Sequence, residues 1–197
     1  MAAQALLAQG HRQIAIVNPK PDHTLFTIRC RTVRDHFERA GGSVVELHPK
    51  AASGTSFPLQ PVMDVAQVMP LVDEATEHLR RRAARGSAAV PTAIFCPADS
   101  IAALVFRALA TRGLVAGRDI SVISCNHERS LVAGLWPSLA TIDVHPQRIG
   151  RLAVDLLARR ISGEFGGSEV QVGVSPTFIP GGSLTRCREP RPRRGKP

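Results

Sequence analysis

Short runs of apolar residues recur along the chain, each bounded by Gly, Pro or polar residues. They are four to six residues long, which is the length of a strand buried on both faces and too short for most helices. Their positions predict strands near residues 13–17, 44–47, 92–96, 120–124 and 139–142.

Between these runs the apolar residues recur with helical spacing. Cys30, Val33 and Phe37 fall on one face of a helix expected from about residue 27 to 40. Similar stripes predict helices over about 65–84, 100–112 and 147–161, and residues 49–61 form a long Pro/Gly/Ser loop. Two late runs, VQVGV (170–174) and TFI (177–179), predict further strands. The alternation of strand and helix predicts an α/β fold, a parallel sheet with helices on both faces.

Polar residues follow three of the predicted strands. They are Asn18 to His23, Pro97-Ala98-Asp99 and Asn126-His127-Glu128. In parallel sheets the carboxyl ends of the strands meet at one edge, and ligands bind beyond that edge. We therefore expect these three segments to form one rim and a small-molecule site.

The net charge of +9 is concentrated in the last residues. Residues 185–197 carry six basic side chains and one Glu, and so contribute +5. This tail has almost no apolar residues and is predicted to be disordered. The rest of the chain shows no zinc-finger spacing, basic helix or aromatic interleaving that would indicate direct reading of nucleic acid.

Several classes of function are disfavoured. No run approaches about 18 apolar residues, so no membrane span is expected, and the start of the chain lacks the pattern of a secretory leader. The four cysteines make no Cys-x-x-Cys pair, so three are interpreted as small buried side chains, and neither metal nor cofactor is expected. A reducing cytoplasm fits this usage.

Catalysis is the alternative for the rim, because Cys96, Asp99, Cys125 and His127 can share it. The chain has no Gly-x-Ser-x-Gly elbow, phosphate-binding loop or His-Glu-x-x-His motif. We therefore expect a binding protein and not an enzyme.

Four separated blocks carry a family resemblance. They are AQALLAQGHRQIAIV, PTAIFCPADSIAALVFRALATRGLVAGRDISVIS, WPSLATI and PQRIGRLAVDLLARRISG. In their order and spacing they resemble the LacI/GalR family of transcription repressors. In that family a helix-turn-helix head precedes a two-lobed core of the type I periplasmic-binding-protein kind, which closes on a small effector, often a sugar, and acts as a dimer.

The resemblance implies three segments in this chain. Residues 1–143 correspond to the C-terminal lobe, residues 144–184 to a crossover helix and strands that belong partly to the N-terminal lobe, and residues 185–197 to the basic tail. The DNA-binding head has no counterpart here, so DNA binding is expected only through a head outside this chain. A homodimer and a sugar-like effector are the implied partners.

The resemblance also implies site residues. An effector-binding Arg is expected about twelve residues before the Gly that ends the first helix, which selects Arg29, with Arg31 as the competing register. The family's Asp after the fourth strand is Asn126 here. After the third strand Asp99 persists, and we expect it to cap its helix in preference to touching ligand.

Other positions depart from the family's pattern. Ala98 stands where the family has Asn, Cys125 where it has an aromatic residue, and Gly181 or Gly182 where it has Arg. These departures put the usual sugar specificity in question. Two alternatives therefore stay open: a periplasmic-type sugar-binding protein, and an interaction fragment without ligand binding.

Overall fold

The computed structural model describes residues 1–49, 65–85 and 90–187, with backbone only for 78–85. The predicted loop over residues 49–61 therefore lies, except for Pro49, outside the described residues. Strands and helices alternate along the chain in the order α1 (Ala2–Ala8), β1 (Gln13–Val17), α2 (Thr24–Arg39), β2 (Ser43–Leu47), α3 (Val65–Arg85), β3 (Ala93–Phe95), α4 (Asp99–Thr111), β4 (Ser121–Asn126), α5 (Arg129–Val132), β5 (Ala140–Asp143), α6 (Pro146–Ile161) and β6 (Thr177–Ile179).

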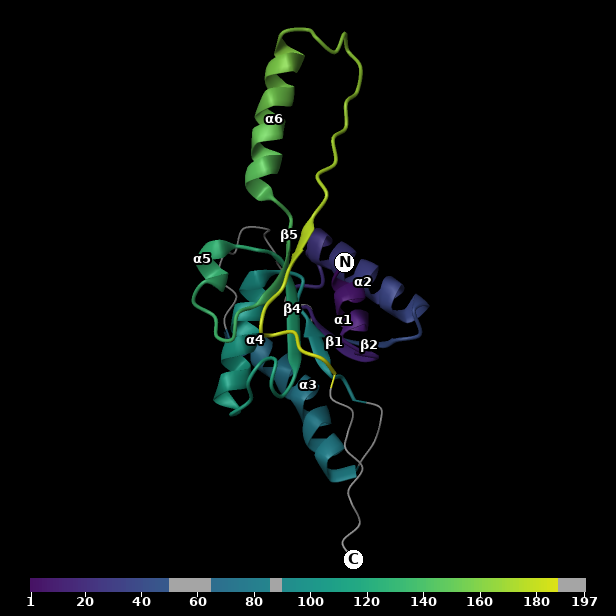
Figure 1. Ribbon diagram of the computed structural model, residues 1–197, viewed down its shortest axis with the longest axis vertical. Helices are drawn as coiled ribbons and strands as arrows, with labels where there is room; N and C mark the ends of the chain where they lie inside the picture. The colour runs from purple at the N-terminus through teal and green to yellow at the C-terminus, as the bar shows by residue number, and fades with distance from the viewer. Residues whose placement is uncertain (50–64, 86–89, 188–197) are drawn as a thin grey trace, which may run out of the picture.

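The strands form one sheet in the order β2-β1-β3-β4-β5-β6. The predicted parallel sheet is confirmed for the first five strands of that order, whereas β6 pairs antiparallel to β5. The direction of β6 follows from the path of the chain (Figure 1). After β5 the chain leaves the sheet at the carboxyl edge, passes through α6, and returns to that same edge, so β6 must run the opposite way.

Helices cover both faces of the sheet. Ala15, Ile94 and Val122 belong to the core beneath α3 and α4. Ile14, Ile16 and Phe95, which alternate with them along the strands, belong to the core beneath α1 and α2. The chain turns one way from β1 through α2 to β2 and the other way from β2 through α3 to β3, which places these helices on opposite faces. The point where the direction reverses lies between β1 and β3.

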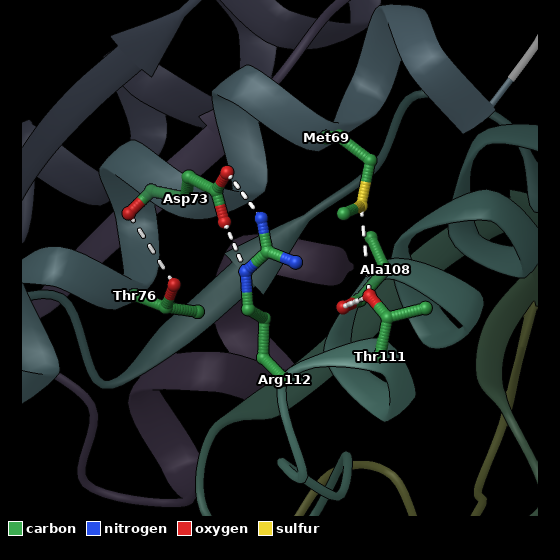
Figure 2. Close-up of polar contacts among 6 residues, drawn as sticks. All are labelled: Met69, Asp73, Thr76, Ala108, Thr111 and Arg112. Carbon is green, nitrogen blue, oxygen red and sulfur yellow. Dashed lines mark hydrogen bonds and ion pairs between the residues drawn. The ribbon is translucent and has the colours of Figure 1, made fainter.

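Helices α3 and α4 are joined near their surface by a bidentate ion pair (Figure 2). The Arg112 guanidinium donates to both carboxylate oxygens of Asp73, at 2.7 and 2.6 Å. Beside it, the Thr111 hydroxyl donates to the sulfur of Met69 at 3.7 Å. Pro70 lies inside α3. Hydrogen bonding to the Asp73 carboxylate raises the pKa of Arg112. Because both carboxylate oxygens accept a bond, the orientation of the guanidinium is fixed.

The segment after β6 is held against the amino ends of β4 and β5. We call residues 180–187 the strap. Ser183 is fully buried: its hydroxyl donates to the Val122 carbonyl and accepts from the Ala140 amide. The prediction of a disordered tail from residue 185 is therefore wrong for residues 185–187, because Thr185 and Cys187 are hydrogen-bonded to the body of the protein. The rest of the predicted tail, residues 188–197, lies outside the described residues.

A buried histidine fixes the strap. His11 hydrogen-bonds through Nδ1 with the Thr92 hydroxyl at 2.8 Å and through Nε2 with the Thr185 carbonyl at 3.0 Å. Burial lowers the pKa of His11 below its ordinary value of 6.5, and the bond to Thr185 opposes this only in part. Protonated His11 is thus favoured in the unfolded chain relative to the folded one.

This shift predicts an acid-sensitive stability. The stability that neutral His11 contributes to the folded state is fully present above its ordinary pKa of 6.5. It is lost as the pH falls toward the lowered pKa of the folded state. Between about pH 7 and 5 we expect the free energy of unfolding to fall more steeply in the wild type than in His11→Asn, by up to about 1.4 kcal/mol per pH unit. Urea titrations at several pH values measure it. His36→Asn, a change at an exposed histidine of α2, should keep the wild-type slope, and parallel curves for wild type and His11→Asn would contradict the assignment.

The chain from residue 144 to 176 extends away from the sheet (Figure 1). We call these residues the arm. Helix α6 has no buried residue, and Val154 and Ile161 are 69% and 79% exposed, so the apolar face of this projecting helix is poorly covered. The predicted strand VQVGV is wrong: residues 170–174 are extended but pair with no strand among the described residues. An apolar alternation forms a strand only where a neighbour accepts its hydrogen bonds.

Candidate functional site

The carboxyl ends of β1, β3 and β4 lie side by side, as the parallel order requires. Asn18 follows β1 and is buried, with its side-chain oxygen accepting from the amide of Lys20. Arg29 lies on α2, which follows β1, and its guanidinium donates to the carbonyl of Pro97 after β3 at 2.7 Å. This contact spans the point where the strand order reverses, the usual place for a ligand crevice in an open α/β sheet. We call this edge, with residues 18–29, 97–99 and 126–128, the rim.

Arg29 is half-buried at the rim, whereas Arg31 is exposed. A guanidinium carries several donors, so the bond to Pro97 leaves others available. The structure therefore places Arg29, of the two candidate registers, against the segment that follows β3.

Asp99 lies beneath the rim and not on its surface. It is fully buried, and its carboxylate accepts from the hydroxyl of Ser124, from the hydroxyl of Thr141 at 2.7 Å, and from the backbone amide of Glu128 at 2.7 Å. The prediction that Asp99 caps its helix is wrong: Ala98 is the N-cap of α4 and Asp99 is the first helical residue. The carboxylate instead ties together β4, β5 and the loop after β4.

The loop after β4 adopts an uncommon backbone conformation. Asn126 and His127 have φ angles of 118° and 58°, in the region that residues with a Cβ seldom occupy. The Asn126 side-chain amide donates to the Glu128 carboxylate at 2.9 Å, and the Glu128 amide is held by Asp99. The carboxylate of Glu128 therefore lies beside Asn126, at a position where the sequence showed only the loss of an acidic residue.

His23, His127 and Glu128 lie in segments predicted to form the rim, but none of them was selected individually as a ligand-binding residue. Nδ1 of His23 and Nδ1 of His127 are buried without a hydrogen-bond partner among the described residues. The His23 ring stacks on Phe26, with centroids 4.1 Å apart. The signal in the sequence was the position of His127 directly after β4, and of His23 in the polar segment between β1 and α2. An unpaired buried nitrogen is costly, so both atoms are candidates to bond a ligand.

The cysteines near the rim do not form a catalytic centre. Cys30, Cys96 and Cys125 are buried free thiols, as predicted. Burial raises the pKa of Cys30 to about 12 and that of Cys125 to about 11, with Arg29 opposing the shift at Cys125. These thiols are protonated near neutral pH and are poor nucleophiles. In the part of the chain that the structure describes, no three His, Cys, Asp or Glu side chains are placed to hold a metal ion.

A doubly covered, mostly parallel sheet with polar side chains at its carboxyl edge defines the class of small-molecule-binding α/β lobes. The family described as periplasmic binding protein-like domain matches residues 3–184. The chain belongs to this family, in the form found in the effector-binding core of LacI-family repressors.

Relatives and solved structures agree with this assignment. The ribose operon repressor of Haemophilus influenzae is 26% identical over 161 residues, which cover 82% of this chain and 43% of the repressor. The chain thus spans less than half the length of that relative. The structure of the dimeric Lac repressor with an 11-residue C-terminal deletion has a TM-score of 0.68 at 19% identity, covering 95% of this chain and 60% of that one.

A second solved structure carries a ligand. It is a LacI family transcriptional regulator from Enterococcus faecium with bound ribose, with a TM-score of 0.65 at 19% identity, covering 95% of this chain and 62% of that one. At these identities the structures show the shared fold alone. None of the helices among the described residues has the length and apolar character to cross a membrane.

Proposed function

We propose that this chain is the effector-sensing part of a LacI-type transcription repressor and that its effector is a sugar. The observation that carries the proposal is the rim itself. Arg29 comes from the segment after β1, and Asn126 and Glu128 come from the loop after β4. Together they offer guanidinium donors, an amide and a carboxylate at the carboxyl edge of a lobe of this family. Vicinal hydroxyls of a sugar need such a mixture of donors and acceptors.

The roles within the site differ. Arg29 and Asn126 contact the ligand, Glu128 supplies the negative charge that the family's Asp would supply at residue 126, and Asp99 supports the loop from below. The ribose operon repressor and the ribose-bound regulator favour a pentose as the effector. The proposal includes no catalytic step.

The partners follow from the same relatives. The dimeric state of the Lac repressor favours a homodimer, and repression would require DNA contact through the family's helix-turn-helix head. A cytoplasmic location is part of the proposal, since operator DNA lies there.

Mutation of Arg29 tests the site. Titration of ¹⁵N-labelled chain with D-ribose, D-galactose and D-glucose should shift the backbone amide resonances of the rim, including that of Glu128. Arg29→Ala should weaken binding of the sugar with the lowest Kd by about 1.5–3 kcal/mol, the range for hydrogen bonds to a charged group. This corresponds to a rise in Kd of roughly 10- to 150-fold. The rim contacts the sugar from one side only and leaves much of it in water, so the wild-type chain itself should bind weakly, with a high Kd.

Arg31→Ala is the matched control, since Arg31 is an exposed arginine two residues away on the same helix. It should bind like the wild type. Equal affinity of wild type and Arg29→Ala would remove Arg29 from the site, and a loss in Arg31→Ala alone would select the other register. Rim resonances that respond to none of the three sugars would contradict the proposed function.

A further inference from the structure

The arm is connected to the sheet by two neighbouring segments. One runs from β5 through Val144 and His145 into α6, and the other returns through Thr177 into β6 (Figure 1). We call these two segments the neck. Because α6 buries none of its residues, the contacts within the neck decide the direction in which the arm leaves the lobe.

One side chain bonds both segments of the neck. Nδ1 of His145 lies 3.3 Å from the Asp143 carboxylate, and the His145 backbone amide donates to the same carboxylate at 2.7 Å. Nε2 of His145 lies 2.8 Å from the hydroxyl of Thr177 on the returning segment. Nδ1 thus faces the Asp143 carboxylate, and Nε2 shares a hydrogen bond with the Thr177 hydroxyl. Both nitrogens of the ring are thereby used.

The backbone of His145 is also unusual. Its φ is 54°, in the left-handed region, and it is the residue that caps α6. Such a conformation has an energetic cost for a residue with a Cβ and persists where surrounding contacts hold it. Pro146 directly after it begins the helix with its own φ restrained, so the turn from strand to helix is concentrated at His145.

The neck is continuous with the rim. In the β4–β5 ladder Asp143 lies opposite Asn126, and in the β5–β6 ladder it lies opposite Thr177. The side chains of Asp143 and His145 are 18% and 29% exposed, so water weakens their contact less than it would at the surface, whereas the bond to Thr177 is exposed.

We propose that Asp143, His145 and Thr177 form a clip that sets the direction of the arm relative to the sheet, with His145 as the positioning residue. The clip links the two segments by side chains at the point where the β5–β6 ladder ends. Its consequence for sensing rests on the proposed function: a ligand bonded to Asn126 would act on the strand position next to the clip, and so on the arm.

A distance measurement tests the clip without any ligand. Spin labels at Val154→Cys on the arm and Glu38→Cys on α2 report the arm-to-lobe distance by double electron–electron resonance. The background is Cys187→Ser, since the other three cysteines are buried, and labelled chain is diluted with unlabelled chain. His145→Ala should shift and broaden the distance distribution, and Thr177→Val, which removes only the hydroxyl, should do the same. His145→Gln keeps an acceptor of similar reach and should restore part of the narrow distribution.

Melting temperature and a matched variant separate positioning from loss of fold. His36→Ala, at an exposed histidine of α2, should leave the distribution unchanged, and Thr177→Val should melt close to the wild type. A distribution that is unchanged in either His145→Ala or Thr177→Val overturns the clip, as does equal broadening in His36→Ala. No sugar is added, so a failure here leaves the ribose titration unaffected, and a failed titration leaves the clip standing.

Discussion

Asp99→Ala should lower the free energy of unfolding by about 3 kcal/mol, because three donors lose their common acceptor in a fully buried position. These donors are the hydroxyls of Ser124 and Thr141 and the backbone amide of Glu128. The hydroxyls can turn toward other acceptors, but the amide is fixed by the backbone. Urea denaturation followed by circular dichroism measures the loss.

The same variant separates support of the rim from stability alone. Without the carboxylate the loop after β4 loses its anchor, so the Glu128 amide should exchange with deuterium faster than the amides of α4. Asp35→Ala is the control, an exposed aspartate on α2 whose change should cost little. If Asp99→Ala were as stable as Asp35→Ala, the carboxylate would not organise the rim.

The inner strands β1, β3, β4 and β5 were predictable because they are buried on both faces, whereas the edge strand β2 alternates exposed and half-buried residues. Strands buried on both faces appear as continuous apolar runs, and the observed β1 and β5 agree with the prediction within one residue. The convergence of Asn126 and Asp99 at one edge followed from the parallel rule alone. The pattern of apolar residues reflects burial, so it identified those strands and helices that have a buried face.

The errors arise where pairing or a single-residue offset decides the outcome. Val170 and Val172 alternate with polar residues as in a strand, yet both are at least 40% exposed, because no strand in the part of the chain that the structure describes lies beside them to pair with. Asp99 can occupy the N-cap or the first helical position of α4, and one residue of offset turns its carboxylate from its own helix toward β4 and β5. Short α5 has too few residues for a periodic signal.

The strap was missed for a related reason. Ser183 and Thr185 have the composition of a solvated tail, and their partners lie far away in sequence, on β4 and on the loops around it. Polar residues that satisfy buried backbone groups cannot be distinguished by composition from polar residues in water.

Gly117→Ala should be the second strongly destabilising change, with a loss of about 3 kcal/mol. Gly117 has a φ of +77°, and a Cβ there would overlap the carbonyl of Gly182 in the strap. The left-handed conformation alone costs a residue with a Cβ about 1–2 kcal/mol, and displacement of the strap adds the rest, because the Gly117 carbonyl accepts the bond from the Thr185 hydroxyl. Urea denaturation measures the total.

Gly113→Ala separates the two contributions, since Gly113 lies in the same connection, has a φ of +69°, and has open space where its Cβ would stand. It should lose only the conformational part, about 1 kcal/mol. In Gly117→Ala the amides of Ser183 and Thr185 should exchange faster with deuterium, and in Gly113→Ala they should stay protected. Equal losses in the two variants, with the strap protected in both, would show that the strap does not rest on Gly117. A larger loss in Gly117→Ala, with faster exchange at Ser183 and Thr185, would show that the contact with Gly117 holds the strap against the amino ends of β4 and β5.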